Sequence, residues 1–144
     1  MKFRMGAALL SLLGLFVAAY LYLYKIGRIG TLACGTGGCE TVQASEWSRF
    51  HGVEVALIGV LGYAALLVVS LISLQPQLAG RRWPAAILAA LAGGGVGFTA
   101  YLTYLELFVI HAICQWCVGS AVIAVSLFVV SLLDWRAGRA VEAA

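Results

Sequence analysis

Charged residues are scarce in this chain of 144 residues, since Asp, Glu, Lys and Arg together make up only 10% of it. Hydrophobic residues make up 63%, and the mean hydropathy is +1.02. A water-soluble domain of this size needs more polar surface, so the composition excludes a soluble enzyme. Only two prolines are present, which excludes a proline-rich disordered chain. The net charge of +3 is spread over several loops and offers no continuous basic face for nucleic acid.

What the chain does contain is long uncharged runs, which indicate a polytopic protein of the lipid bilayer. The runs cover residues 5–24, 55–80 and 83–133, and the last is interrupted only by Glu106. A bilayer core of about 30 Å needs roughly 20 helical residues per crossing. The first two runs therefore supply one span each, and the third must turn and supply two.

The predicted fold class is an all-α membrane protein, a bundle of four transmembrane helices in a single domain, 1–144. The strongly polar residues of the third run are Glu106, His111 and Gln115, so we expect its turn at residues 107–112 and the fourth helix to begin near Ile113. The predicted spans are about 5–24, 55–74, 84–106 and 113–133, with an external loop at 25–54.

The basic residues predict how the bundle lies in the membrane. One side of a four-span chain carries six of them, namely Lys2, Arg4, Arg81, Arg82, Arg136 and Arg139. The opposite side carries three, which are Lys25, Arg28 and Arg49. Cytoplasmic loops are enriched in Lys and Arg, so both termini are predicted to be cytoplasmic. All four cysteines then lie on or near the outer face.

These cysteines form two pairs, and their expected position suggests redox chemistry. Cys114 and Cys117 have C-x-x-C spacing, which puts both side chains on one helix face at a separation compatible with a disulfide. At a helix N-terminus the unpaired N–H groups favour a thiolate at Cys114. Cys34 and Cys39 enclose three glycines, so their loop can turn sharply. In an oxidising compartment such thiols form and exchange disulfides.

Two other uses of four cysteines stay open at this point. Static disulfides bracing an external loop are one, although closing the short Cys114–Cys117 loop removes little entropy from the unfolded chain. A tetrahedral zinc site is the other, but the wider spacing of Cys34 and Cys39 fits it poorly. We therefore expect no metal and favour exchange chemistry.

Repeated oxidation and reduction of these thiols requires an electron acceptor in the membrane, and the sequence has no haem, flavin or nucleotide motif. A lipid-soluble quinone, ubiquinone or menaquinone, is the natural candidate. It would dock beside Cys117 against aromatic groups, for which the candidates are Phe98, Tyr101, Tyr104 and Phe108. Aromatic side chains at such spacing are also commonly used for helix packing, and that reading stays open.

Taken together, the order of these features resembles the vitamin K epoxide reductase family, specifically its bacterial homologues that form disulfides. The resemblance rests on the loop pair Cys34 and Cys39, on VQASEW at residues 42–47, on Gly52, and on YLTYLEL at 101–107 before Cys114 and Cys117. It implies a four-helix bundle around a quinone, with a short surface half-helix at residues 42–50 in the first external loop. The chain departs from the family by having Val53 and Glu54 after Gly52, where a proline is usual, and by a short loop between Cys34 and Cys39.

The resemblance also implies roles for single residues. Cys117 would react with the quinone and Cys114 would be its partner. Cys39 would exchange with Cys114, and Cys34 would face a periplasmic thioredoxin-like protein. Ser45 would lie near the quinone.

Two further residues are candidates for a proton or polar role. His111 has a side chain suited to proton transfer near neutral pH. An acidic residue within a span, such as Glu106, is energetically costly unless it forms an ion pair or contacts water. Such a residue usually belongs to a functional site.

The function expected from the sequence is a quinone-dependent thiol oxidase of the bacterial inner membrane that reoxidises a thioredoxin-like protein. One alternative is the other four-span disulfide generator, but there the C-x-x-C pair comes in the first external loop, the reverse of the order here. Another is a membrane scaffold or interaction protein with static disulfides.

Overall fold

The computed structural model of the chain describes residues 2–28, 41, 44, 46, 49–50, 52–78 and 80–143, without the side chains of residues 49–50 and 138–143. Within this part, four helices are long and apolar enough to cross a membrane. They are α1 (Lys2–Lys25), α3 (Val55–Ser73), α4 (Trp83–Leu105) and α5 (Gln115–Ala143). Helices satisfy their backbone hydrogen bonds internally, as a lipid environment requires. The expected all-α bundle of four transmembrane helices is confirmed.

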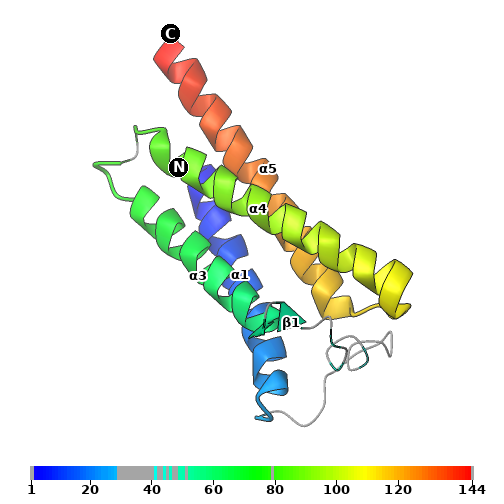
Figure 1. Cartoon of the computed structure of the whole chain (residues 1–144). Coiled ribbons are helices and arrows are strands. Elements are labelled where there is room, and N and C mark those ends of the chain that lie inside the picture. Colours follow the sequence, from blue (N-terminus) through cyan, green and yellow to red (C-terminus); the bar gives the residue numbers. More distant parts are fainter. Residues whose placement is uncertain are drawn as a thin grey trace.

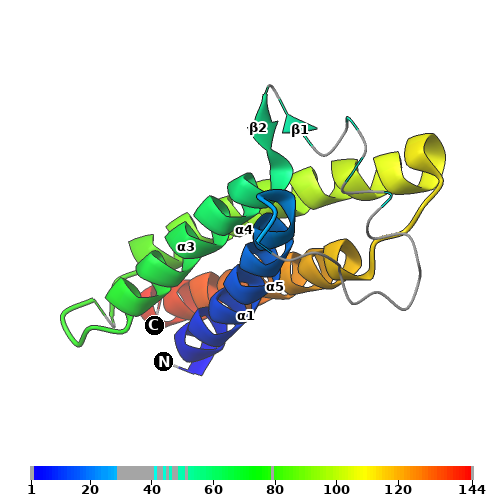
Figure 2. The ribbon, with the colours of Figure 1, turned by 90° about the horizontal axis from the view of Figure 1, so that it is seen from below.

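The helices are arranged so that each packs against two neighbours. α1 packs on α3 and α5, and α4 packs on α5 and α3 (Figures 1 and 2). Both termini and the connection between α3 and α4 lie at one end of the bundle, while the turn between α4 and α5 lies at the other (Figure 1). The core contains many small residues, among them Ala7, Ala18 and Ala92, which let helices approach closely.

A short hairpin precedes α3 at the same end as the α4–α5 turn. Its strands are β1 (Arg49–Phe50) and β2 (Val53–Glu54), which pair antiparallel, and Gly52 has a left-handed φ of 82° in the turn between them. The hairpin occupies the last two positions of the predicted surface half-helix. Most of the remainder of that helix lies outside the described residues, as do Cys34, Cys39 and Ser45.

An acidic residue stands at the start of α3. Glu54 is the N-cap residue of this helix, with extended backbone angles, and its carboxylate lies 3.5 Å from the Lys25 Nζ at the end of α1. A negative charge is favourable at a helix N-terminus. Glu54 therefore supports the start of the second span and links it to the first.

The turn between the third and fourth spans differs from the sequence-based prediction. The third span extends beyond Leu105 as a π-helix, η2 (Glu106–Ile110), and ends at His111, which has a left-handed φ of 58°. α5 begins only at Gln115. The predicted turn at residues 107–112 was therefore placed too early. Glycine usually supplies this left-handed position, so a histidine there gives no signal in the sequence.

The opposite end of the bundle is tied together by a buried arginine. Arg4 is only 4% exposed. Its guanidinium donates to Asp134 Oδ2 on α5 at 3.0 Å, to the Ser73 carbonyl at the end of α3 at 2.9 Å, and to the carbonyls of Leu78 and Arg81 at 2.8 and 2.6 Å. The basic residue at position 4 is thus an internal link between three helices as well as one of the residues that predict orientation.

Candidate functional site

The C-x-x-C pair lies where α5 begins. The Cys114 carbonyl accepts the first helical hydrogen bond, from the Val118 amide at 3.0 Å, which places Cys114 at the N-cap of the helix. N-cap side chains accept hydrogen bonds from amides of the first turn that have no other partner. The Cys114 sulfur does this for the amides of Trp116 and Cys117. Cys114 is fully buried at 0% exposure, and Cys117 is half-buried.

These contacts make Cys114 the more acidic thiol. Both residues of the pair are free thiols in the structure. The Cys117 thiol hydrogen-bonds to the Cys114 sulfur, and this contact, helped by the two amides, lowers the pKa of Cys114 from its ordinary 9.0 to about 7. Burial and the negative charge of Glu106 oppose the shift. A thiol with this pKa is about half thiolate at pH 7, and the thiolate is the form that attacks disulfides.

Glu106 lies directly against the two thiols. Its side chain is buried, at 3% exposure, and its Oε2 accepts a hydrogen bond from the Cys114 backbone amide at 3.2 Å. The carboxyl is also a hydrogen-bond partner of the Cys117 thiol, whose single proton is shared between this carboxyl and the Cys114 sulfur. The Glu106 carbonyl accepts from the Ala112 amide at 3.1 Å. Glu106 therefore holds the chain between the two helices through both its backbone and its side chain.

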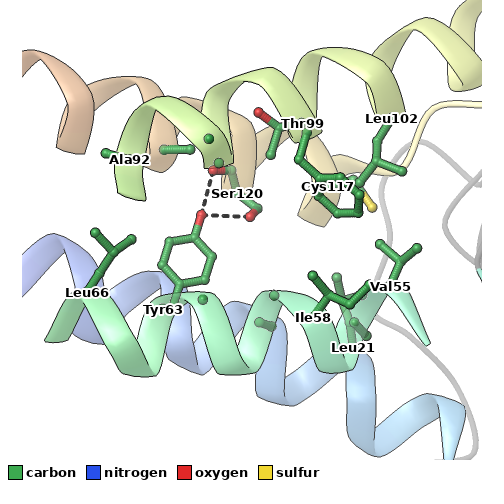
Figure 3. A pocket seen from close by; sticks show the side chains of 18 of the residues that line it. Leu21, Val55, Ile58, Tyr63, Leu66, Ala92, Thr99, Leu102, Cys117 and Ser120 are labelled. Atoms are coloured by element: carbon green, nitrogen blue, oxygen red, sulfur yellow. Dashed lines mark hydrogen bonds between the residues drawn. The ribbon is translucent and has the colours of Figure 1, made fainter. Parts of the chain in front are cut away.

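A cavity of about 280 Å³ opens beside Cys117 within the bundle (Figure 3). All four spans contribute to its wall, which is mostly apolar, with few polar groups. Glycines at positions 59, 62, 94 and 95 leave room for it. Small-molecule sites have this character, an apolar hollow with a few placed polar groups. The polar groups on the wall are those of Tyr63, Thr99, Thr103, Glu106, Cys117 and Ser120.

Tyr63 and Ser120 form a hydroxyl pair on the wall of this cavity. The Tyr63 hydroxyl donates to the Ser120 carbonyl at 2.8 Å and lies 2.8 Å from the Ser120 Oγ (Figure 3). Ser120 follows Cys117 by three residues, so both lie on the same face of α5. The pair joins α3 to α5 and leaves hydroxyl groups within reach of a bound ring.

The aromatic residues expected beside the quinone are only partly brought together. Phe98 lines the cavity. Tyr101, Tyr104 and Phe108 are exposed on the outer side of α4 and η2 and are absent from the cavity wall. Tyr104 and Phe108 contact each other, with ring centroids 5.1 Å apart. A helix turns by about 100° per residue, so Thr99, Thr103 and Glu106, spaced by four and three, face inward instead.

Sequence reasoning identified Glu106 on this inner face but missed Thr99 and Thr103. Thr99, Thr103 and Glu106 form a stripe of helical spacing that would have marked the inner face of α4. Tyr63 and Ser120 have no comparable signal, because isolated hydroxyl residues are common in membrane helices. His111, the other candidate for proton transfer, is exposed at the turn.

These features describe a four-helix membrane protein with a dithiol on the wall of an apolar cavity. Residues 6–132 match the Vitamin K epoxide reductase family, and the chain belongs to this family. Members are membrane thiol–disulfide oxidoreductases with a quinone or vitamin K as electron partner. The sequence-based assignment to the family is confirmed. The chain is therefore a multi-pass membrane oxidoreductase.

Proposed function

We propose that this chain is a thiol oxidase of a bacterial inner membrane, which reoxidises a periplasmic thioredoxin-like protein and passes the electrons to ubiquinone or menaquinone. The observation that carries the proposal is the position of Cys117. Its thiol lines the apolar cavity, and it hydrogen-bonds to Cys114, which has a lowered pKa and lies at the start of α5. One sulfur thus faces the cavity, and the other is suited to disulfide exchange.

In the proposed relay, disulfide exchange moves electrons inward along the cysteines. A reduced thioredoxin-like protein attacks the Cys34–Cys39 disulfide, and the resulting loop dithiol then attacks the Cys114–Cys117 disulfide through a mixed disulfide of Cys39 and Cys114. Cys117 leaves when Cys39 attacks the Cys114 sulfur. Cys114 leaves in the next step, when Cys34 attacks Cys39 and closes the loop disulfide, and its low thiol pKa favours this step. The products are an oxidised loop and the dithiol of Cys114 and Cys117, which is the state in which the structure holds this pair.

The cavity suits a quinone ring, which when bound would accept two electrons and two protons. Its wall is apolar, as a lipid-soluble ring requires, and the Ser120 hydroxyl, which lies 2.8 Å from the Tyr63 hydroxyl, can turn its proton to a ring oxygen while the Tyr63 proton stays on the Ser120 carbonyl. Phe98 is available to pack against the ring, whereas Tyr101, Tyr104 and Phe108 are better assigned to lipid contact. Ser45 is retained as a candidate contact on the family resemblance alone.

The proposed orientation places the dithiol end of the bundle outside the cytoplasm. It is supported by the basic residues near the two termini and the α3–α4 connection, which share one end (Figure 1). In intact cells, a membrane-impermeant maleimide should label Cys34 in the reduced protein and leave an Arg136→Cys variant unlabelled at position 136. The reverse pattern would contradict this orientation.

The decisive experiment measures quinone reduction by the purified protein with a reduced thioredoxin-like protein as electron donor. The wild-type protein should reduce ubiquinone or menaquinone in a one-to-one ratio with the disulfide formed. Cys117→Ala should abolish quinone reduction, because it removes the sulfur on the cavity wall. It should also accumulate the mixed disulfide of Cys39 and Cys114, which is detectable by mass spectrometry.

Ser126→Ala is the matched control for this experiment. Ser126 lies on the same helix, is partly exposed, is absent from the cavity wall, and donates to the Val122 carbonyl of its own helix at 2.9 Å. This variant should retain the wild-type rate. Full activity of Cys117→Ala would remove Cys117 from its proposed role. Detection of only Cys34–Cys39 and Cys114–Cys117 disulfides at every redox potential would instead favour a scaffold with static disulfides.

A further inference from the structure

Glu106 is a buried acid whose charge has no basic partner within the described part of the chain. The ion pairs found there join Arg4 to Asp134 and Lys25 to Glu54. A carboxyl group buried in a membrane protein is costly and is usually kept for a function. The groups that contact the Glu106 carboxyl are the Cys114 amide and the Cys117 thiol.

The local backbone holds this carboxyl in place. Glu106 is the first residue of the π-helix, where α4 widens by one residue per turn, and π-helical turns are frequent at functional sites. The Ala112 amide donates to the Glu106 carbonyl, and the Cys114 amide donates to the Glu106 side chain. Two hydrogen bonds therefore hold the turn to Glu106. The same side chain lines the cavity together with Cys117. The carboxyl thus touches both the thiol that carries a proton and the space that a ligand would fill.

We propose that the Glu106 carboxylate takes the proton from the Cys117 thiol and delivers it to the oxygen of a quinone bound in the cavity. The step rests on the proposed function. Two thiols and one quinone give one disulfide and one quinol, so two electrons and two protons leave the sulfurs. Glu106 carries the Cys117 proton and ends the cycle as a carboxylate again. The second proton reaches the quinol from the water that received it when Cys114 ionised.

A purely structural role for Glu106 makes a different prediction. The Cys114 amide needs only an acceptor, and the side-chain oxygen of glutamine supplies one with nearly the same size. Glu106→Gln therefore keeps the turn but cannot accept a proton. It also removes a negative charge beside Cys114, and this charge raises the pKa of that thiol. Among the described residues, the titratable groups that interact with Glu106 are the Cys117 thiol, through a hydrogen bond, and the Cys114 thiol, through its charge, so the thiols report on the charge of Glu106.

The first measurement uses reduced, quinone-free protein and follows the rate of Cys114 alkylation by iodoacetamide against pH. The midpoint in Glu106→Gln should lie below that of the wild type. The second measurement follows quinone reduction, where Glu106→Gln should lower kcat by about 100-fold or more, a typical contribution of a positioned acid–base group. The KM for quinone should change little, and Glu106→Asp, which keeps a carboxyl, should recover part of kcat.

Glu54→Gln is the matched control, because Glu54 lies at the same end of the bundle in an ion pair with Lys25. It should leave both measurements at wild-type values. An unchanged alkylation midpoint in Glu106→Gln would show that Glu106 is uncharged beside the thiols and would overturn the proposal, as would a kcat equal to that of the wild type. A wild-type protein that reduces no quinone would instead overturn the proposed function itself.

Discussion

Cys114 combines two positions that rarely occur together, since it caps a helix and is fully buried. Burial alone would raise the pKa of a thiol. The hydrogen bond from Cys117 and the two amides of the first helical turn outweigh burial, and the pKa falls to about 7. Half of the Cys114 thiol is therefore ionised at about pH 7, two units below the ordinary thiol pKa of 9.0. The reactivity of this residue follows from its neighbours.

This balance predicts how alkylation of Cys114 depends on pH. In the reduced protein the rate should rise with pH, with a midpoint near 7, because only the thiolate reacts. Cys117→Ala removes the main hydrogen-bond donor, and its midpoint should move up toward 9.0. Cys117→Ser keeps a donor, so its midpoint should stay closer to 7. An equal shift in the alanine and serine variants would show that the hydrogen bond is not the cause.

At the scale of single residues, the sequence predicted those with a distinctive spacing or with a high free-energy cost of burial in the membrane. The C-x-x-C pair and the acid at position 106 were both identified as candidates, and the structure brings them into contact. Tyr63 and Ser120 were not identified, because single hydroxyl groups are inexpensive in a membrane helix when they bond to nearby carbonyls. Their pairing depends on how α3 faces α5, which no local pattern encodes.

Among the helices, α4 determines most of the candidate site. Its inner face carries Phe98, Thr99, Thr103 and two glycines, and its π-helical extension carries Glu106. The sequence predicted the number of spans, because length and hydropathy fix it. The inward face of α4 was not predicted in the same way, because Thr99 and Thr103, which mark it, are small hydroxyl residues that are common in membrane helices. The aromatic residues were therefore assigned to the cavity, although most of them lie outside it.

The cavity can be filled from α4 without disturbing the packing of the helices. Gly95 lines the cavity, and a Cβ atom there would meet no atom within 4 Å. Gly95→Leu should lower quinone reduction by about tenfold or more, equivalent to about 1.4 kcal/mol, because the leucine occupies the ligand's space. The melting temperature should stay near the wild-type value.

Gly97→Leu is the control for this prediction. Gly97 is on the same helix, and a Cβ atom there would likewise meet no atom within 4 Å, but this residue is not part of the cavity wall. It should retain wild-type quinone reduction. Equal losses in the two variants would point to a general effect on α4 instead of a filled cavity.

For the molecule as a whole, the two ends of the bundle differ in how they are held. At the end with the dithiol, the turn between α4 and α5 closes onto Glu106, and Lys25 pairs with Glu54. The opposite end is joined by Arg4, which binds Asp134 and three backbone carbonyls. Removing one member of a buried ion pair leaves the other uncompensated and costs about 3–5 kcal/mol.

Arg4→Ala should therefore destabilise the protein by about 3–5 kcal/mol, measured as the free energy of unfolding in mixed micelles. Arg4→Lys should recover only part of this, because an ammonium group cannot bind so many acceptors in the same fork geometry. Lys2→Ala is the control, since Lys2 is exposed two residues earlier on α1. Loss of stability equal to that of Lys2→Ala would show that the Arg4 contacts contribute nothing.

The Arg4 contacts also bear on biogenesis. Arg4 is synthesised first, yet its acidic partner Asp134 follows more than a hundred residues later and its carbonyl partners lie in the middle of the chain. The Arg4 guanidinium on the first helix therefore has no acidic partner until the last helix has been synthesised and inserted. A chain truncated before Asp134 would keep the carbonyl partners of Arg4 but lack its acidic partner, so the buried charge would stay uncompensated.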